Sequence, residues 1–297
     1  MRMVHSAHGI ATASQTHHPT IGTIHFGNVI RMFRMINVTV SYDSGIDWSR
    51  FVQEGNAIKK EIALSNGKTI SYDDLILAVG SEGTTFGIPG VAENVFQMKS
   101  VIDARKIRHS LLSTYESVED GLLPLESLNV VIVGGGPTGV ELAGAVNALQ
   151  HEIRREFEHI APKATVTLLE AGPRLLPTFH PHSSKYTLKT LTKMGVHVQV
   201  DAAVVEATPR SLILKDGSEL VAGTRIWAAG VVAPPNWKFL GETDRGNRIK
   251  VNSHLQISDS IWIVGDVASF PNSDGRPLPM VAPVAIQQGK HVARQIR

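Results

Sequence analysis

The chain contains no cysteine, and its 29 Lys and Arg nearly balance its 27 Asp and Glu, for a net charge of +2. Without a thiol, these residues supply no disulfide, no thiolate metal site and no cysteine nucleophile. The small net charge gives no electrostatic reason to expect nucleic acid as a partner. The chemistry must therefore come from other groups or from a bound cofactor.

Long apolar runs are missing as well. No stretch reaches the ~18 consecutive apolar residues of a membrane-spanning helix, and residues 1–20 lack the apolar segment of a secretory signal. We therefore expect neither feature in this chain. Its length of 297 residues is enough for two domains, and its composition, 42% hydrophobic and 19% charged, is that of a globular protein.

Five of the thirteen histidines lie near the N-terminus, at His5, His8, His17, His18 and His25. Their spacing is neither helical nor strand-like, and the surrounding Ser-, Thr- and Gly-containing sequence offers no rigid shell for a metal. We interpret residues 1–30 as an atypical arm and expect no metal site.

A glycine-rich turn stands in the middle of the chain, in LNVVIVGGGPTGVELAGAV at 128–146. Gly134, Gly136 and Gly139 have the GxGxxG spacing, follow an apolar run and open a helical pattern. In such a turn the first glycine permits the bend, the second admits a pyrophosphate and the third lets the helix lie against the strand. The pattern predicts a dinucleotide site, with a purely structural turn as the alternative.

Glu170 ends the next strand-like run, ATVTLLE. A carboxylate there can accept hydrogen bonds from ribose hydroxyls and would repel a 2′-phosphate, which favours NAD over NADP. The interval of 170 − 134 = 36 residues exceeds the usual ~20, so the connecting helix must be long. The alternative is that Glu170 merely ends a strand.

The remaining patterns predict a sequence of short elements. Residues 38–79 are β-rich, with hairpin turns expected at Asn66-Gly67 and Asp216-Gly217. One helix is expected over 98–117, with Val101, Ala104, Ile107, Leu111 and Leu112 on its apolar face. The other expected elements are strands at 129–133, 164–170 and 224–229, and helices at 137–159, 181–194 and 281–296. Because helix and strand alternate only in the middle third, we predict a βαβ domain set inside a second domain.

Two later stretches carry polar groups. IWIVGDVASF at 261–270 places Asp266 after a buried strand, either at a ligand site or as the cap of an ordinary turn. The last helix carries the amides Gln287 and Gln288, suited to a carbonyl-bearing partner. An ordinary amphipathic helix with exposed glutamines is the alternative.

Together these stretches resemble the two-dinucleotide flavoprotein reductases, and most closely the type II (non-proton-pumping) NADH:quinone oxidoreductases. The resemblance covers roughly residues 31–297, through SYDDLILAVGSEGTTFGIPG, GGGPTGVELAG, LLEAGPRLLPTF, IWAAGVVAP, IWIVGD and APVAIQQG. It implies an α/β fold of two Rossmann-like domains, with an NADH domain at 119–257 inserted in an incomplete FAD domain at 31–118 and 258–297. The residues ahead of the glycine turn then belong to the flavin domain.

The resemblance also implies roles for individual residues. Glu141 matches a glutamate near the nicotinamide and flavin rings, and Gln287 and Gln288 are the amides that could meet a quinone. The residues matching cofactor contacts are Gly134, Gly135, Gly136, Thr138, Gly139, Glu170, Ala229 and Gly230 for NADH, and Gly80, Gly265, Asp266, Ala282 and Val284 for FAD.

Three features depart from the family pattern. Pro283 stands where the family has a glutamine, and residues 1–37 supply no GxGxxG for the FAD pyrophosphate. The C-terminal amphipathic membrane-binding region of the family does not follow in this chain. We therefore expect weakened flavin binding.

The missing cysteine separates the candidate activities. Glutathione-, lipoamide- and thioredoxin-type reductases need a cysteine pair, which this chain does not have. The resemblance implies hydride transfer from NADH to FAD and two-electron reduction of a quinone. It implies a cytoplasmic protein that is peripheral to the inner face of the membrane, binds no nucleic acid and has the homodimer as an option. The alternatives are a ferredoxin- or rubredoxin-type reductase and a catalytically weak NADH-binding fragment.

Overall fold

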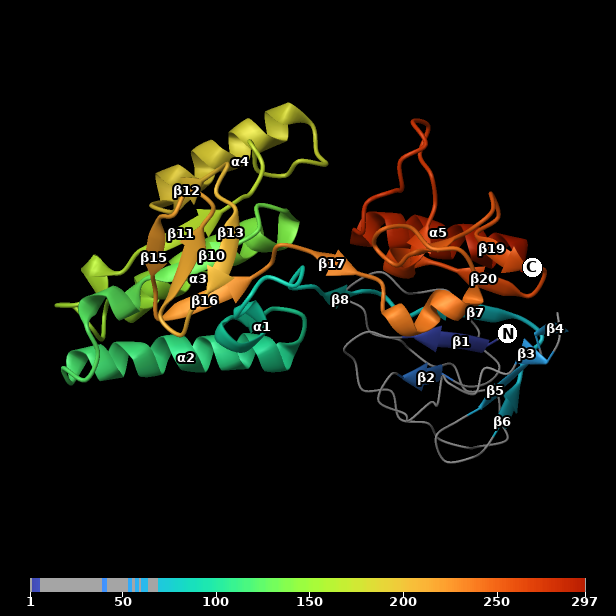
Figure 1. Ribbon diagram of the computed structural model, residues 1–297, viewed down its shortest axis with the longest axis horizontal. Helices are drawn as coiled ribbons and strands as arrows, with labels where there is room; N and C mark the ends of the chain where they lie inside the picture. The colour runs from blue at the N-terminus through green and yellow to red at the C-terminus, as the bar shows by residue number, and fades with distance from the viewer. Residues whose placement is uncertain are drawn as a thin grey trace. The chain divides into compact units, whose positions relative to one another are not determined.

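The chain forms two compact units, one of them inserted in the sequence of the other (Figure 1). The computed structural model describes residues 2–5, 39–41, 53–54, 57–58, 60–63 and 69–296. The outer unit comprises Met1–Glu82 and Val232–Arg297, and the inner unit is the continuous segment Gly83–Val231. This confirms the predicted α/β architecture in which one domain interrupts another.

The boundaries of these units differ from the expected ones at 118/119 and 257/258. Residues 83–118 belong to the inner unit, because Ile107 and Leu111 of helix α2 (Val101–Glu119) share a core with Ile226 of the inner sheet. Residues 232–257 belong to the outer unit, where Ile249 packs with Leu77. Core packing, which motif order does not reveal, sets the boundaries.

The inner unit is built on a five-stranded parallel sheet. Its strands, in spatial order, are β12 (His197–Gln199), β11 (Val166–Leu169), β10 (Val130–Val133), β16 (Thr224–Trp227) and β9 (Phe96–Gln97). All four residues of β10 are buried, as expected for a central strand covered on both faces.

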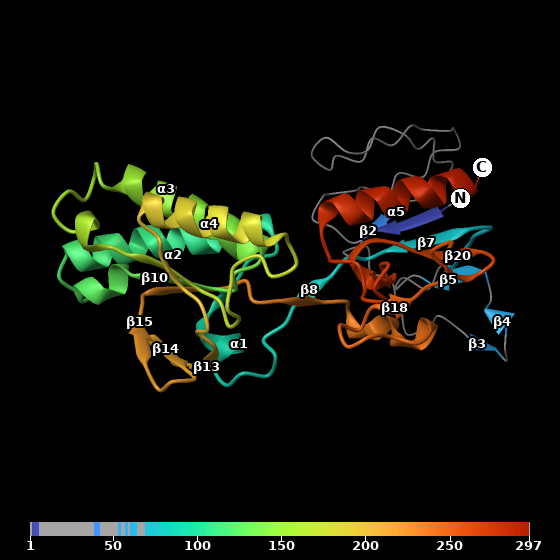
Figure 2. The same cartoon turned by 90° about the horizontal axis from the view of Figure 1, so that it is seen from above.

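Alternate residues of β10 enter different cores. Val130 and Ile132 pack with helices α2, α3 (Pro137–Ile153) and α4 (Pro181–Met194). Val131 and Val133 pack with the meander of β13 (Val204–Ala207), β14 (Ser211–Leu214) and β15 (Glu219–Val221). Figure 2 shows the three helices on one side of the sheet and the meander on the other. A continuous apolar run in the sequence therefore serves two cores.

The outer unit holds a second five-stranded sheet. Its order is β19 (Gln256–Ser258), β20 (Ile261–Ile263), β7 (Leu75–Ala78), β1 (Arg2–His5) and β2 (Thr39–Ser41), all parallel except β19. Helix α5 (Ala282–Gln295) packs Val292 against Ile76 and Trp262. On the other face Leu77 and Ile263 meet Trp237 of the 3₁₀ segment η5 (Pro235–Leu240).

For residues 2–5, strand β1 corrects the interpretation of the N-terminal segment 1–30 as an arm. Its residues Arg2–His5 pair in parallel with both β7 and β2, so this stretch belongs to the sheet. A four-residue strand without alternating polarity carries too little pattern to be found from sequence. The other four N-terminal histidines lie outside the described residues.

The short elements complete the two units. They are β3 (Gln53–Glu54), β4 (Ala57–Ile58), β5 (Glu61–Ala63), β6 (Thr69–Ser71), β8 (Glu82–Gly83), α1 (Val91–Asn94), η3 (Leu125–Leu128), η4 (Ala161–Lys163), β17 (Val231–Val232), β18 (Ile249–Lys250), η6 (Gly265–Val267) and β21 (Ala268–Ser269). β5 and β6 pair antiparallel as predicted, while Asn66-Gly67 itself lies outside the described residues. Gly217 joins β14 to β15 with a φ of 85°, which confirms the second predicted turn.

Two helix predictions need correction. Helix α2 begins after Ser100, whose Oγ accepts a hydrogen bond from the Asp103 N–H at 3.0 Å in a capping box. Val101 therefore stands at the first turn, 63% exposed, and the buried face runs instead through Ile107, Leu111, Tyr115 and Val118. Helix α3 ends at Ile153, short of the expected residue 159.

Within the described ranges, no helix combines the length and apolarity needed to cross a bilayer.

Candidate functional site

The glycine turn of the inner unit joins the end of β10 to the start of α3. Gly134 has a φ of 114°, and a Cβ there would lie 2.5 Å from the carbonyl oxygen of Ala228. A Cβ on Gly139 would lie 1.8 Å from the carbonyl oxygen of Gly134. The packing of the protein itself thus requires glycine at both positions.

Gly136 differs from its neighbours. Its φ of −73° suits any residue, and a Cβ there would meet nothing within 4 Å. It stands at the N-cap of α3, where no side chain caps the helix. Open space thus adjoins a helix N-terminus with its partial positive charge, beside the exposed Thr138. This arrangement can receive an anionic group such as a pyrophosphate.

Glu170 lies beside this turn, because β10 and β11 are parallel neighbours that end at the same edge of the sheet. Its Oε2 accepts a hydrogen bond from the Gly135 N–H at 2.7 Å, and its Oε1 accepts one from the Gly172 N–H at 2.7 Å. The sequence placed this acid near the turn but did not reveal either backbone contact. Glu170 is therefore more than the end of a strand: it holds the glycine turn in shape.

The other flank of the turn is formed by the residues after β16. The Ala228 N–H donates to the Val133 carbonyl at 2.7 Å, and the Cα of Ala229 would lie 2.6 Å from a Cβ on Gly134. Gly230 lies against Phe86, whose Cζ would be 2.5 Å from a Cβ there. Ala229 thus adjoins the glycine turn, whereas Gly230 adjoins Phe86. Glu141 lies further along α3 with an exposed side chain.

A second pair of turns meets in the outer unit. Gly80 and Gly265 follow the parallel neighbours β7 and β20 with φ values of 71° and 76°. The Ser81 hydroxyl donates to Oδ2 of Asp266 at 2.7 Å, which joins the two turns. Asp266 therefore sits where two strands end at one sheet edge, the position at which open α/β folds bind ligands.

Gln288 and Gln287 have different surroundings. Gln288 is 5% exposed, and its Oε1 accepts a hydrogen bond from the Gly265 N–H at 2.7 Å. Gln287 is exposed. Of the two amides expected to meet an acceptor molecule, Gln288 is instead buried and bound to the Gly-Asp turn, because it faces the sheet. Ala282 and Val284 stand in the first turn of α5, exposed and half-buried respectively.

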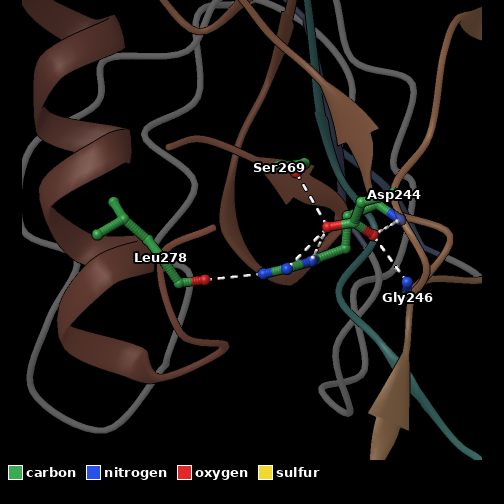
Figure 3. Close-up of polar contacts among 5 residues, drawn as sticks. Asp244, Gly246, Ser269 and Leu278 are labelled. Carbon is green, nitrogen blue, oxygen red and sulfur yellow. Dashed lines mark hydrogen bonds and ion pairs between the residues drawn. The ribbon is translucent and has the colours of Figure 1, made fainter. Parts of the chain in front are cut away.

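An ion pair that the sequence did not reveal holds the segment that precedes α5 (Figure 3). Asp244 binds the Arg248 guanidinium at 2.7 Å, with the two side chains 15% and 13% exposed, and also accepts from Ser269 at 3.0 Å. Arg248 in turn donates to the Leu278 carbonyl at 2.7 Å. Desolvation raises the pKa of Asp244, but hydrogen bonds from Arg248 and Ser269 and the charge of Arg248 outweigh it and leave the pKa lowered. The network thus anchors the segment that leads into α5.

Proteins with similar sequences include NAD(P)H-ubiquinone and NADH:quinone oxidoreductases. An internal alternative NAD(P)H-ubiquinone oxidoreductase A1 of Arabidopsis thaliana mitochondria is 32% identical over 92% of this chain and 57% of its own length. A type II NADH:quinone oxidoreductase of Haemophilus influenzae is 35% identical over 77% of this chain and 56% of its own length. The chain thus spans somewhat more than half the length of these relatives.

Solved structures show the same fold. NDH2 from Plasmodium falciparum in complex with NADH matches with a TM-score of 0.62 and 27% identity, over 70% of this chain and 47% of that chain. A ferredoxin reductase from Rhodopseudomonas palustris matches with a TM-score of 0.63 and 21% identity, over 85% of this chain and 56% of that chain. The family model of pyridine nucleotide-disulphide oxidoreductases matches residues 7–289. Because this match covers nearly the whole length of the chain, the chain belongs to the pyridine nucleotide-disulphide oxidoreductase family.

Proposed function

We propose that this chain carries the NADH- and FAD-binding parts of a type II NADH:quinone oxidoreductase. The observation that carries the proposal is the open space at Gly136, where the packing of the protein demands no glycine but a pyrophosphate would. The names of the relatives in Arabidopsis thaliana and Haemophilus influenzae support the quinone as acceptor. Because the chain has no cysteine, the disulphide chemistry in the family's name does not extend to these residues.

In the inner unit, the proposed ligand is NADH. The backbone of the Gly134–Gly139 turn and the N-terminus of α3 would bind the pyrophosphate, with Thr138 at its side. Glu170 would accept hydrogen bonds from the ribose hydroxyls with the lone pairs that Gly135 and Gly172 leave free. Ala229-Gly230 would border the nucleotide, and Glu141 would stand at the nicotinamide end.

In the outer unit, the proposed ligand is FAD. Asp266 would accept hydrogen bonds from the ribityl chain, beside the positive-φ turns at Gly80 and Gly265. Ala282 and Val284 would border the ring, and the N-terminus of α5 would favour negative charge there. Bound FAD would supply the redox chemistry, accepting a hydride from NADH and passing two electrons to the quinone. The protein would orient both ligands and exclude water.

The exposed Gln287 is the amide that we propose meets the quinone. Its carbonyl-binding N–H groups would orient the acceptor, while Gln288 remains occupied by Gly265. A location at the inner face of the membrane is part of the same proposal, since quinones reside in membranes. The proposal also includes a homodimer as an option.

The test is to titrate the purified chain with FAD and NADH and then measure turnover of a soluble quinone with and without excess FAD. We expect NADH to bleach the flavin absorbance, and turnover to need added FAD because residues 1–37 contain no GxGxxG. Reduction of ferredoxin but not quinone would favour the ferredoxin-reductase alternative. NADH binding without any flavin reduction would leave only a nucleotide-binding role.

A further inference from the structure

We propose that Ser81 and Gln288 are positioning residues, which hold the Gly265–Asp266 turn in the form that receives the polyol chain of a flavin. The inference rests on the proposed function of the outer unit. In this proposal neither side chain contacts the flavin itself. Each acts on the turn from a different element, Ser81 from the loop after β7 and Gln288 from α5.

Ser81 orients the carboxylate. Its hydroxyl donates to Oδ2 of Asp266 at 2.7 Å, and the two residues are 185 positions apart in the sequence. Among the residues that the structure describes, no hydrogen bond reaches Oδ1 of Asp266. One carboxylate oxygen is therefore held by the protein, and the other is presented as an acceptor for a ligand hydroxyl.

Gln288 orients the backbone of the same turn. Gly265 adopts a φ of 76°, and a Cβ there would lie 3.6 Å from the Cβ of Ala285, so α5 packs closely against the turn. One helical turn beyond Ala285, Gln288 accepts from the Gly265 N–H at 2.7 Å while 5% exposed. A buried amide with a short hydrogen bond is a rigid support.

The two contacts act together because they fix adjacent residues. A carboxylate that is already oriented loses less freedom when a ligand binds than one that must first find its rotamer. The flavin affinity should therefore depend on both Ser81 and Gln288, although the hydroxyl of Ser81 and the amide oxygen of Gln288 already form hydrogen bonds within the protein.

The experiment is a titration of the full chain with FAD, followed by the quenching of flavin fluorescence. Ser81→Ala and Gln288→Met should each raise the Kd for FAD roughly tenfold, which corresponds to about 1.4 kcal/mol. Ser81→Thr restores the hydroxyl, so it should recover most of the affinity. The Kd for NADH, which binds in the inner unit, should not change.

Matched controls come from the same unit. Ser273→Ala removes a hydroxyl that lies 3.5 Å from Asp274 in an exposed turn, and Gln295→Met alters an exposed glutamine at the end of α5. Both should leave the Kd for FAD unchanged. Ser81→Ala removes one atom from a half-buried side chain, so it decides the question even if Gln288→Met unfolds.

Two results would overturn the inference in distinguishable ways. If the wild-type chain binds FAD and Ser81→Ala binds it equally well, the positioning role is wrong while the proposed function stands. If the wild-type chain binds no FAD at all, the flavin site proposed for the outer unit is wrong, and this inference falls with it.

Discussion

Three glycines of one turn have different reasons to be glycine. At Gly134 and Gly139 the backbone of the protein occupies the space of a side chain, whereas at Gly136 that space is open. Substitution at the first two therefore tests the fold, and substitution at Gly136 tests the ligand. This contrast is the most direct residue-level evidence for a nucleotide site.

Gly136→Val should abolish NADH binding, because the new side chain fills the ligand's approach, and should leave the melting temperature nearly unchanged, because a Cβ there meets nothing within 4 Å. Gly139→Ala should instead destabilise the protein, since its Cβ would lie 1.8 Å from the Gly134 carbonyl oxygen. Fluorescence titration and thermal melting measure the two effects. Gly144→Ala, on the same helix with only Met194 at 3.9 Å, is the control that should change neither. A folded Gly136→Val variant with unchanged NADH affinity would refute the site.

Glu170 should make the chain prefer NADH to NADPH. A 2′-phosphate beside this carboxylate would face repulsion of ~1–4 kcal/mol at an intermediate dielectric, or roughly tenfold or more in affinity. Glu170→Gln should narrow the preference for NADH and also weaken NADH binding. Each carboxylate oxygen of Glu170 accepts one backbone hydrogen bond, from Gly135 or Gly172, whereas an amide has a single acceptor oxygen and its nitrogen only donates. Titration of both nucleotides gives the ratio of dissociation constants, with Glu206→Gln, at an exposed position of β13, as the control. Equal affinities in the wild type would show that Glu170 does not discriminate.

At the scale of elements, parallel neighbouring strands bring the functional turns together. β10 with β11 unites the glycine turn with Glu170, and β7 with β20 unites Gly80 with Asp266. Helix α5 contacts the second of these groups through the hydrogen bond between Gln288 and Gly265. The segment that precedes α5 is held by the hydrogen bond from Arg248 to the Leu278 carbonyl. The position of α5 should therefore depend on the Asp244–Arg248 pair.

Asp244→Asn should lower the free energy of unfolding by about 2–3 kcal/mol at neutral pH, because it leaves a largely buried guanidinium without its counter-charge. The pKa of Asp244 is lowered in the folded state, so its contribution is present above the ordinary pKa of about 3.9 and is lost as pH falls through the folded value. Urea unfolding at a series of pH values should show the wild type and the variant converging in acid. Asp274→Asn, whose exposed partner is Arg276, should have little effect at any pH. A constant difference between wild type and Asp244→Asn down to acid pH would contradict this account.

At the scale of the whole molecule, each hydrophobic core formed by the described residues lies within a single unit. The three clusters around the inner sheet lie within Gly83–Val231, and the two around the outer sheet lie within Met1–Glu82 and Val232–Arg297. The inner unit is also continuous in sequence. Such a segment has the features of an independent folding domain.

A fragment of residues 83–231 should therefore fold alone, melt cooperatively and bind NADH within about threefold of the full chain's affinity. Circular dichroism and nucleotide titration test both properties. The same fragment with Gly136→Val should fold but not bind. A fragment that stays unfolded in buffer would show that the inner unit depends on the outer one.

The turns and strands around the nucleotide site could be predicted from sequence because their signals are local. An apolar run, three spaced glycines and a strand-ending acid lie within 134–170, and the structure places Glu170 on the turn as the pattern requires. The hairpin at Gly217 and helix Pro181–Met194 were found for the same reason. Their signals come from residues that neighbour one another along the chain.

The sequence by itself thus determined the α/β class, the inserted arrangement and the positions of both sets of turns. The tertiary structure alone decided where the units divide, that Arg2–His5 forms a strand, and that Gln288 is bound inward while Gln287 is exposed. It also decided the pairing of Ser81 with Asp266 and of Arg248 with Leu278. The physical reason is that local patterns specify elements, whereas contacts between residues far apart in the chain depend on how these elements pack.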